Sequence, residues 1–293
     1  MRLYGVLVIP VLLSATSVFG SEALDTATIE RLVGVKGTLS DKEGVLKVSF
    51  PRTDLAVNVA GVRLTPPMGL TSWAAFTRVG SQAMVMGDTV LLEDQVNPVL
   101  SVALESGLEV TALHNHFFWE TPRVMFMHLS GVGDEAGLAT AVAKVWAKLR
   151  ETSGGKGVVL GADIDPAQSN LEVKALDAAF GRNGNFQNGV YRVVVGRDTT
   201  LHGHAMGDAM GMNTWAAFAG ADDNALVDGD FVVFENELQP VLKSLRKSRI
   251  NIVAIHHHMV GETPRTIFLH YWGRGSATAL AEGVKAALGQ TAH

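Results

Sequence analysis

The pattern of hydrophobic and polar positions predicts one series of elements that occurs twice along the chain. Alternating apolar residues indicate strands, and apolar residues at spacings of three and four indicate helices. The predicted helices of the first half cover residues 26–34, 94–107 and 134–151, and its predicted strands cover 45–50, an extended piece at 69–76, 83–93 and the two segments flanking 120–123. The second half follows with helices at 170–181 and 275–290 and strands at 190–195, 225–235 and on both sides of 262–265.

These elements predict an α+β fold made of two tandem homologous domains. The main series of each half is β-β-α-β-β-α, which favours an antiparallel or mixed sheet covered by helices. This order is compatible with a circularly permuted ferredoxin-like layout and with a paired-module metalloenzyme of the vicinal-oxygen-chelate type. We expect the two halves to be related by a pseudo-two-fold axis.

The sequence itself repeats, which supports duplication of a whole domain. The segment "GLTSWAAF" at 69–76 returns as "GMNTWAAF" at 211–218, an offset of 142 residues. Upstream, "GVLKVSFPRTD" from Gly44 resembles "GVYRVVVGRD" from Gly189, an offset of 145. Glycine, serine, aspartate and proline cluster between the halves. We therefore expect one domain at residues 21–155 and a second at 156–293.

The N-terminus resembles a signal peptide. Arg2 precedes an apolar stretch at residues 3–13, and Val18-Phe19-Gly20 offers a cleavage site before Ser21. Residues 1–20 would then be removed, leaving a periplasmic or secreted chain without a membrane span. The alternative is an uncleaved anchor, for which the apolar stretch is short.

The charge and the cysteine content limit which partners and which metal ligands this chain can have. The formal net charge is −5 with both signs interspersed, so no basic surface indicates a nucleic-acid partner. Cysteine is absent, which excludes disulfides and thiolate metal ligands. A metal site in this chain would need nitrogen and oxygen ligands.

The segment "HNHFFWETPRVMFMH" at 114–128 returns as "HHHMVGETPRTIFLH" at 256–270. Residues two apart on a strand point to the same face. A three-residue loop at 120–122 would place the first histidine of each segment directly opposite the last. The histidines predicted to meet are His114, His116 and His128 in the first half, and His256, His258 and His270 in the second.

Three imidazoles on one face favour a divalent transition metal, zinc first, with copper, manganese or iron as alternatives. Glu120 and Glu262 stand at matching positions, where each could be the fourth ligand or a catalytic general base. Arg123 and Arg265 follow them and could bind an anionic substrate or orient the glutamate. A purely structural polar network and a metal-free substrate pocket are the alternatives.

Other residues carry weaker signals. His202 and His204 lie beside three methionines in the second half alone, which suggests an additional metal site, with copper considered. Gly87-Asp88 and Gly229-Asp230 are typical of turns. The aromatic residues of the repeated "WAAF" segments are predicted to fill the core: Trp73, Phe76, Trp215 and Phe218.

Several segments together resemble the LppY/LpqO family of bacterial exported proteins and lipoproteins, whose function is unknown. The resemblance rests on "GDTVLLEDQVNPVL" and "VTALHNHFFWETPRVMFMH" and, more loosely, on their second copies. It implies tandem domains and an envelope location, and it assigns no site residue. Unlike the lipoprotein members, this chain has no cysteine for lipid attachment.

Three functions are therefore open. The first is an exported metal-binding protein with a histidine-rich site in each repeat, acting as a metal-dependent hydrolase. The second is a non-catalytic periplasmic metal-handling protein. The third is a protein that binds a small or anionic ligand.

Overall fold

The computed structural model describes residues 23–153 and 163–292. The predicted signal peptide and the predicted domain boundary between residues 155 and 156 lie outside these residues. Within them, every helix is too short or too polar to cross a lipid bilayer.

The first repeat contains three α-helices: α1 (Thr26–Val33), α2 (Glu93–Glu105) and α3 (Glu135–Glu151). Its strands are β1 (Gly37–Ser40), β2 (Val45–Pro51), β3 (Asn58–Val59), β4 (Val62–Arg63), β5 (Thr71–Val79), β6 (Gln82–Leu92), β7 (Glu109–His114), β8 (Glu120–Thr121) and β9 (Val124–Gly133). A short 3-10 turn, η1 (Pro66–Met68), precedes β5.

The second repeat follows the same plan, with α4 (Val173–Phe180), α5 (Leu238–Lys247) and α6 (Ala277–Leu288). Its strands are β10 (Asn185–Gln187), β11 (Val190–Gly196), β12 (Thr199–Leu201), β13 (His204–Met206), β14 (Asn213–Ala221), β15 (Asn224–Phe234), β16 (Asn251–His256), β17 (Glu262–Thr263) and β18 (Thr266–Gly275). Short 3-10 turns lie at η2 (Pro166–Gln168), η3 (Asp208–Met210) and η4 (Glu235–Glu237).

Twelve strands form one sheet, in the order β1-β2-β5-β6-β9-β7-β16-β18-β15-β14-β11-β10. The α+β class holds, but the six-element order is incomplete. The leading helices predicted at 26–34 and 170–181 are present as α1 and α4, and each repeat has two further strands in the main sheet. A small three-stranded sheet accompanies each, β4-β3-β8 in the first repeat and β13-β12-β17 in the second. The prediction missed these short strands because two or three residues carry no readable alternation.

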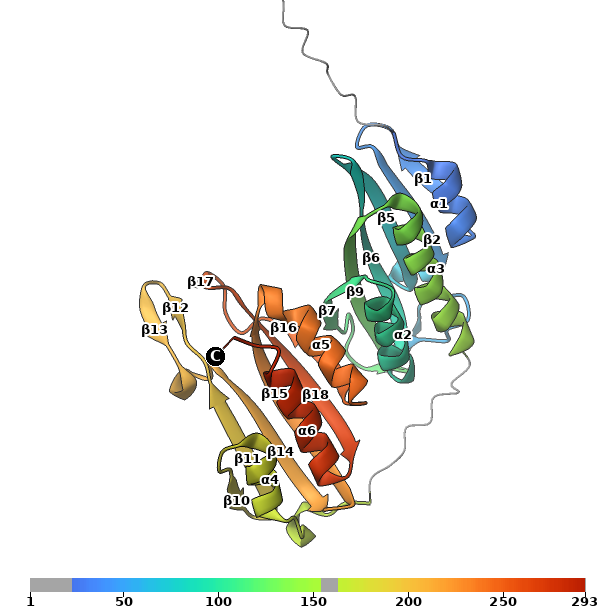
Figure 1. The fold of residues 1–293 in the computed structure, drawn as a ribbon. Coiled ribbons are helices and arrows are strands. Elements are labelled where there is room, and N and C mark those ends of the chain that lie inside the picture. Colours follow the sequence, from blue (N-terminus) through green and yellow to red (C-terminus); the bar gives the residue numbers. More distant parts are fainter. Residues whose placement is uncertain (1–22, 154–162, 293) are drawn as a thin grey trace, which may run out of the picture.

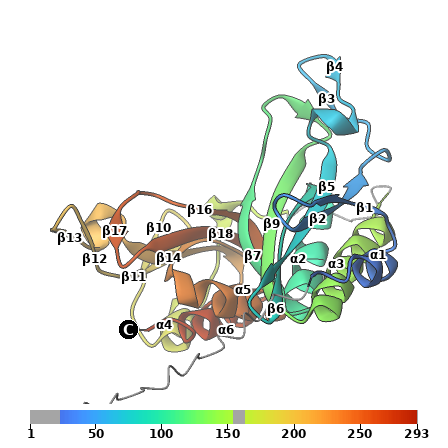
Figure 2. The same cartoon turned by 90° about the horizontal axis from the view of Figure 1, so that it is seen from above.

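The helices of each repeat cover one face of its half of the sheet and leave the other face open (Figures 1 and 2). Alternation along the strands produces this arrangement: Ala74 and Phe76 of β5 are buried against the helices. Trp146 of α3 is 1% exposed and stacks on Phe50 at 5.6 Å between ring centroids. Phe76 and Phe218 are core residues as predicted, whereas Trp73 and Trp215 are only half-buried.

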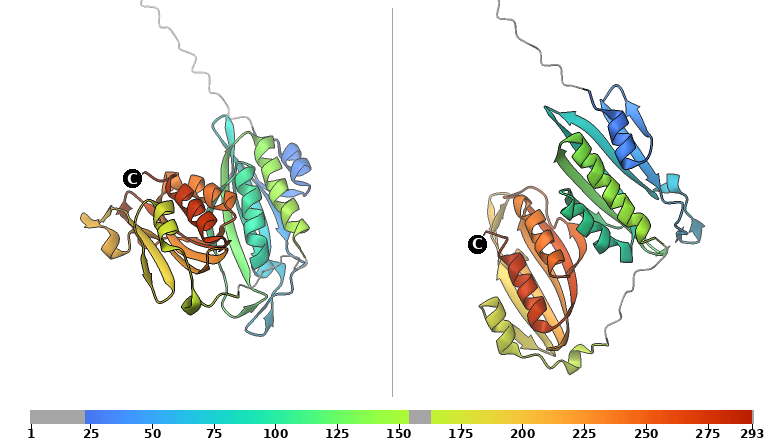
Figure 3. Two further views of the ribbon diagram at one scale, coloured as in Figure 1. Left: turned by 60° about the horizontal axis from the view of Figure 1, so that its bottom comes forward. Right: turned by 45° about the vertical axis from the view of Figure 1, so that its right-hand side comes forward.

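The same strand of each repeat lies at the joint between them. β7 and β16 pair antiparallel through Leu113 and Ile255. These residues are equivalent, since 255 − 113 gives the repeat offset of 142. Helices α2 and α5 lie side by side next to this joint (Figure 3), where Arg246 Nε donates to Ser101 Oγ at 3.0 Å.

Two side-chain amides bind the joint from opposite directions. Asn97 of α2 accepts from the Ile252 N–H at 2.8 Å and donates to its carbonyl at 3.0 Å. Gln239 of α5 does the same for Val110, at 3.0 and 2.9 Å. Each amide therefore satisfies both backbone groups of one residue on the other repeat's strand. We call these contacts the amide clamps.

An arginine holds the start of the second helix in each repeat. Arg52 is fully buried and donates to Gln95 Oε1 at 3.1 Å. Arg197 donates to Glu237 Oε1 at 2.6 Å, and the Phe234 N–H donates to Glu237 Oε2 at 2.8 Å. Burial raises the pKa of the Glu237 carboxyl, but these hydrogen bonds and that from the Ala292 N–H outweigh it and leave the pKa below 4.5.

The residue that accepts from the arginine is the uncharged Gln95 in the first repeat and the carboxylate Glu237 in the second. We therefore predict that acid destabilises the second repeat. Because its pKa is lowered in the folded state, Glu237 stabilises the chain fully above pH 4.5, and the stabilisation fades as the pH falls through the folded value. Glu237→Gln should lower the free energy of unfolding at pH 7 by about 1–2 kcal/mol and flatten its dependence on pH below 5. Denaturant titrations of the wild-type and variant chains between pH 3 and 7 would show this. An equally steep acid dependence in the variant would contradict it.

Candidate metal centre

Three histidines and an aspartate gather on the open face of the first repeat. The helix-covered face contains Val85 and Gly131, which lie beside Leu138 of α3. Alternation therefore turns Asp88 of β6 toward the open face. There it pairs directly with His128 of β9.

His114 ends β7, and His116 lies two residues beyond it. The His114 ring centroid lies 5.1 Å from that of His116 and 5.1 Å from that of His128. The three imidazoles therefore lie as close together as the sequence pattern predicted. Together with Asp88 we call them the first cluster.

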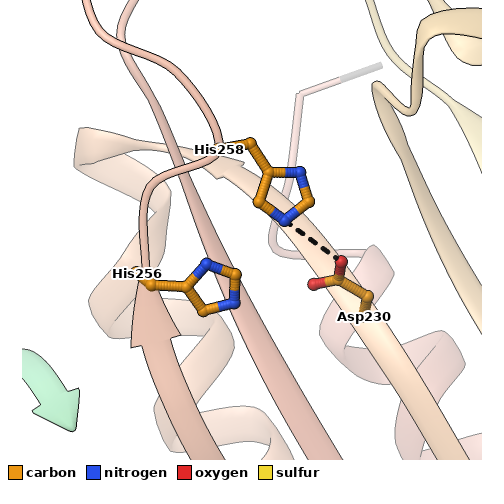
Figure 4. A group of neighbouring side chains, drawn as sticks. All are labelled: Asp230, His256 and His258. Carbon is orange, nitrogen blue, oxygen red and sulfur yellow. Dashed lines mark ion pairs between the residues drawn. The ribbon is translucent and has the colours of Figure 1, made fainter.

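The second repeat builds the same group, the second cluster, from Asp230, His256, His258 and His270. The His256 ring centroid lies 5.1 Å from His258 and 4.9 Å from His270. Asp230 and His270 are paired residues on β15 and β18. His258 Nε2 lies 3.7 Å from Asp230 Oδ2, and His270 Nδ1 lies 4.0 Å from Asp230 Oδ1. Figure 4 shows His256, His258 and Asp230 converging from β15 and the end of β16.

The polar atoms of the second cluster fit a cation. One ligand atom each from Asp230, His256 and His258 lies within 4.8 Å of the other two. Asp230 Oδ1 and His256 Nε2 are buried without a hydrogen-bond partner among the described residues, as is Asp88 Oδ1 in the first cluster. Buried polar atoms without partners are costly, and a bound ion satisfies such atoms. Nitrogen and carboxylate oxygen are the ligands that zinc accepts in proteins when thiolates are absent.

The pKa shifts show how the clusters behave without a cation. Burial raises the pKa of the Asp88 and Asp230 carboxyls, although the three histidines around each act in the opposite direction. Burial lowers the pKa of the His116 and His258 imidazoles. Both imidazoles are therefore held in the neutral form that binds metals.

A phenylalanine fixes the second histidine of each cluster. The His116 ring lies flat on Phe126, with centroids 3.3 Å apart and planes 3° apart. His258 lies on Phe268 in the same way, at 3.4 Å and 9°. Both phenylalanines are buried. Stacking on a buried phenylalanine therefore orients the imidazole rings of His116 and His258, each of which lies two residues beyond the end of its strand.

The predicted strand register is wrong, although the histidines meet. His114 pairs with Phe126 and His256 pairs with Phe268, so His128 and His270 lie two positions further along. The reason is the connection: residues 120–121 form β8, which pairs with β3, and no three-residue hairpin loop exists there. Bulges between Val110 and Ala112 and between Ile252 and Ala254 shift the pairing again, further from the connection than His114 and His256.

The two aspartates were assigned wrongly from the sequence. Gly87-Asp88 and Gly229-Asp230 lie inside β6 and β15 and not in turns. The glycine is there because its neighbours leave no room: a Cβ at Gly229 would approach the Tyr271 ring to 2.2 Å. A signal existed, since each Gly-Asp pair lies inside a longer apolar-rich segment, "AMVMGDTVLL" at 83–92 and "ALVDGDFVVF" at 225–234.

The predicted glutamates are used differently. Glu262 is buried in β17 and accepts from the Thr266 N–H at 2.9 Å and from the Thr266 hydroxyl at 3.1 Å. Burial raises the pKa of its carboxyl, but these hydrogen bonds prevail and lower it overall. Glu120 lies in β8, with Oε1 3.9 Å from Arg123 Nε. In the structure the carboxylate that joins each group of histidines is an aspartate.

The remaining predicted residues lie at the surface. Arg123 is largely exposed, 3.8 Å from Glu93, and Arg265 is exposed, 3.6 Å from Glu235. His202 and His204 are exposed on the β12–β13 hairpin. Two of the nearby methionines serve as packing, since Met212 is buried against Phe268 and Met206 packs on the same group. His257 Nδ1 lies 3.2 Å from the Thr266 carbonyl.

Comparison with known proteins gives a family but no activity. No curated protein matches the chain. Among solved structures, a crystal structure of the trimeric bacterial microcompartment shell protein PduB aligns with 11% identity, covering 86% of this chain and 89% of that one. Its TM-score is 0.20, so it supports no argument about this fold.

A family model matches both repeats, at residues 27–148 and 174–290. The two matched segments agree with the internal repeat and establish a duplicated domain. The chain therefore belongs to the family described as Domain of Unknown Function (DUF1259).

Proposed function

We propose that the chain is an exported metal-binding protein whose two repeats each hold one divalent transition metal ion, zinc first. The ligands would be three imidazoles and one carboxylate in each repeat. The observation that carries the proposal is the second cluster, where Asp230 Oδ1 and His256 Nε2 are buried without partners beside His258.

Four protein ligands favour metal binding over catalysis. A tetrahedral zinc site with three histidines and an aspartate is complete, whereas catalytic zinc sites keep one position for water. The proposal therefore places metal handling first. A metal-dependent hydrolase is the second candidate, because His258 and His270 are partly exposed, at 37% and 43% of their side chains, and solvent reaches the cluster. Manganese or iron, which accept more ligands, would leave room for a substrate.

The remaining parts of the proposal come from the sequence pattern. Export to the periplasm or beyond rests on the apolar N-terminal segment at residues 3–13. The LppY/LpqO resemblance stays a prediction. We also propose a pseudo-two-fold relation between the repeats, supported by the pairing of equivalent residues Leu113 and Ile255 and by the two equivalent amide clamps.

Metal analysis of purified protein tests this proposal. After loading with zinc and desalting, the wild-type chain should carry one ion per repeat. His116→Ala and His258→Ala should each lose one ion, and the double variant should lose both. His204→Ala, which removes an exposed histidine outside the clusters, should change nothing. Zinc that remains in the double variant, or that is lost in His204→Ala, would contradict the proposal.

A further inference from the structure

A pocket of about 310 Å³ lies beside the first cluster, at residues 115–125. Three aromatic side chains line it, those of Phe117, Phe118 and Trp119. The ring centroids of Phe117 and His116 are 6.0 Å apart, while the four side chains of the cluster itself, all among the described residues, lie outside the pocket wall. A cavity of about 150 Å³ already holds benzene, so this pocket has room for a small molecule with one ring.

The aromatic wall is exposed, and its backbone conformation is unfavourable. Phe118 is 72% exposed and Trp119 is 82% exposed. Trp119 has a φ of +61°, in the left-handed region that residues other than glycine rarely adopt. Its counterpart in the second repeat is Gly261, with a φ of +93°, for which this region has no such cost. The first repeat therefore displays a large aromatic side chain at a conformational cost, which is typical of a binding site.

The carboxylate on the pocket wall lacks the partner that its counterpart has. The Glu120 side chain is 3% exposed, and Glu120 pairs with Val59 in the small sheet. In the second repeat the Thr266 N–H and hydroxyl donate to Glu262. The counterpart of Thr266 is Val124, which has no hydroxyl, and no group among the described residues donates a hydrogen bond to the Glu120 carboxylate. A nearly buried carboxylate of this kind favours a ligand that supplies donors.

A ligand in the pocket can contact this carboxylate directly. Glu120 forms part of the pocket wall. Its two oxygens have no hydrogen-bond partner among the described residues, but neither of them is fully enclosed, in contrast to Asp88 Oδ1 of the first cluster. Both oxygens therefore keep some accessible surface.

The charges around the pocket favour a cation. Glu120 and Arg123 are the charged residues on its wall. Arg123 is divided between two carboxylates, with Nε 3.9 Å from Glu120 Oε1 and Nη1 3.8 Å from Glu93 Oε1. Two carboxylates and one guanidinium leave a net negative charge, and Arg123 is 65% exposed, so water weakens its attraction for Glu120. An anionic ligand would add a negative charge beside Glu120, whereas a cationic ligand would neutralise it.

We propose that this pocket binds a small primary amine in its protonated form, with an apolar ring or chain attached. The ammonium group has three N–H donors and donates to the Glu120 carboxylate. The aromatic side chains of Phe117 and Trp119 add ring faces of the kind that attract cations. The apolar part of the amine contacts the rest of the wall, which includes Met125. This site needs no bound metal and stands whether or not the clusters hold one.

Benzylamine and benzyl alcohol form a matched pair of probes, because they share a shape and benzylamine alone is charged at pH 7. Calorimetry or ligand-observed NMR on the full chain should find saturable benzylamine binding, with benzyl alcohol binding about tenfold weaker. Both titrations are made in the presence of a metal chelator, which prevents coordination of the amine to a metal ion. Their result is therefore independent of the proposed metal sites.

Three variants locate the site. Glu120→Gln keeps the shape of the side chain and removes its charge, so benzylamine binding should fall about tenfold, to the level of benzyl alcohol. Trp119→Gly, which reproduces the Gly261 arrangement, should weaken the binding of both probes and keep the chain folded. Glu235→Gln changes an exposed carboxylate of the second repeat, 3.6 Å from Arg265, and should leave both affinities unchanged.

Three results would overturn the proposal. One is the absence of saturable benzylamine binding to the wild-type chain. Another is benzyl alcohol binding as tight as that of benzylamine. The third is benzylamine binding that Glu120→Gln leaves unchanged, which would place the amine elsewhere on the chain.

Discussion

Replacing Asp230 with asparagine is expected to lower the zinc affinity of the second repeat by about a hundredfold or more. Even residues that only hydrogen-bond to metal ligands contribute 10–100-fold, and Asp230 is proposed as a ligand itself. Without metal the same change should raise the free energy of unfolding at pH 7 by about 1 kcal/mol, because it removes a carboxylate charge whose burial is unfavourable and raises the pKa of Asp230. Competition with a zinc indicator would measure the fall in zinc affinity. Denaturant unfolding in the presence of a chelator would measure the rise in the free energy of unfolding.

Asp228→Asn is the matched control. Asp228 lies two residues earlier on β15 and points to the same face, but it is exposed. Removing its charge should leave both the zinc affinity and the stability almost unchanged. Equal zinc affinities for the Asp230→Asn and Asp228→Asn proteins would show that general acidity, and not a site, attracts the metal.

Removing both amide clamps is expected to separate the unfolding of the two repeats. Asn97→Ala leaves the Ile252 N–H and carbonyl without their side-chain partner, and Gln239→Ala does the same to Val110. Each loss should cost about 2–4 kcal/mol, since two backbone groups are left unsatisfied. Calorimetry of the double variant should show two thermal transitions where the wild type shows one.

Gln82→Ala serves as the control for the clamps, because this amide is exposed at the start of β6. It should leave a single transition at the wild-type temperature. A single transition in the Asn97→Ala, Gln239→Ala protein, close to that of the wild type, would mean that β7, β16 and the helix contacts join the repeats without the clamps.

The sequence was most informative where periodicity is long. The strand at 83–93 and the helix at 134–151 match β6 and α3 within two residues, because each carries enough apolar positions to define its period. The later strands of the second half were then predicted at the same positions plus the repeat offset of 142 residues. Short strands such as β3 and β8 carry too few residues for any period.

The candidate site was only partly readable from the sequence. The H-x-H spacing correctly predicted that His114 and His116 lie close together, although β7 ends at His114 and His116 lies beyond the strand. The pairing of His114 with His128 failed by two residues, because the short strand β8 in the connection pairs with β3, a tertiary feature that local spacing does not contain.

The carboxylate was the larger omission. Glu120 and Glu262 lie between the histidines in the sequence. Asp88 and Asp230 lie 40 residues before His128 and His270, and they become neighbours of these histidines only through strand pairing. A Gly-Asp pair is also a frequent turn signal. Here a buried strand uses the glycine for close packing against Leu129 or Tyr271 and turns the aspartate to the open face.

Anomalous diffraction at the zinc edge, from crystals of the zinc-loaded chain, tests the central claim most directly. The account predicts one strong peak per repeat, with three imidazole nitrogens and one aspartate oxygen at about 2.0–2.2 Å from each. The ligands would be His114, His116, His128 and Asp88 in one repeat and His256, His258, His270 and Asp230 in the other. Maps without a peak at either cluster, or with zinc only at the β12–β13 hairpin, would contradict it.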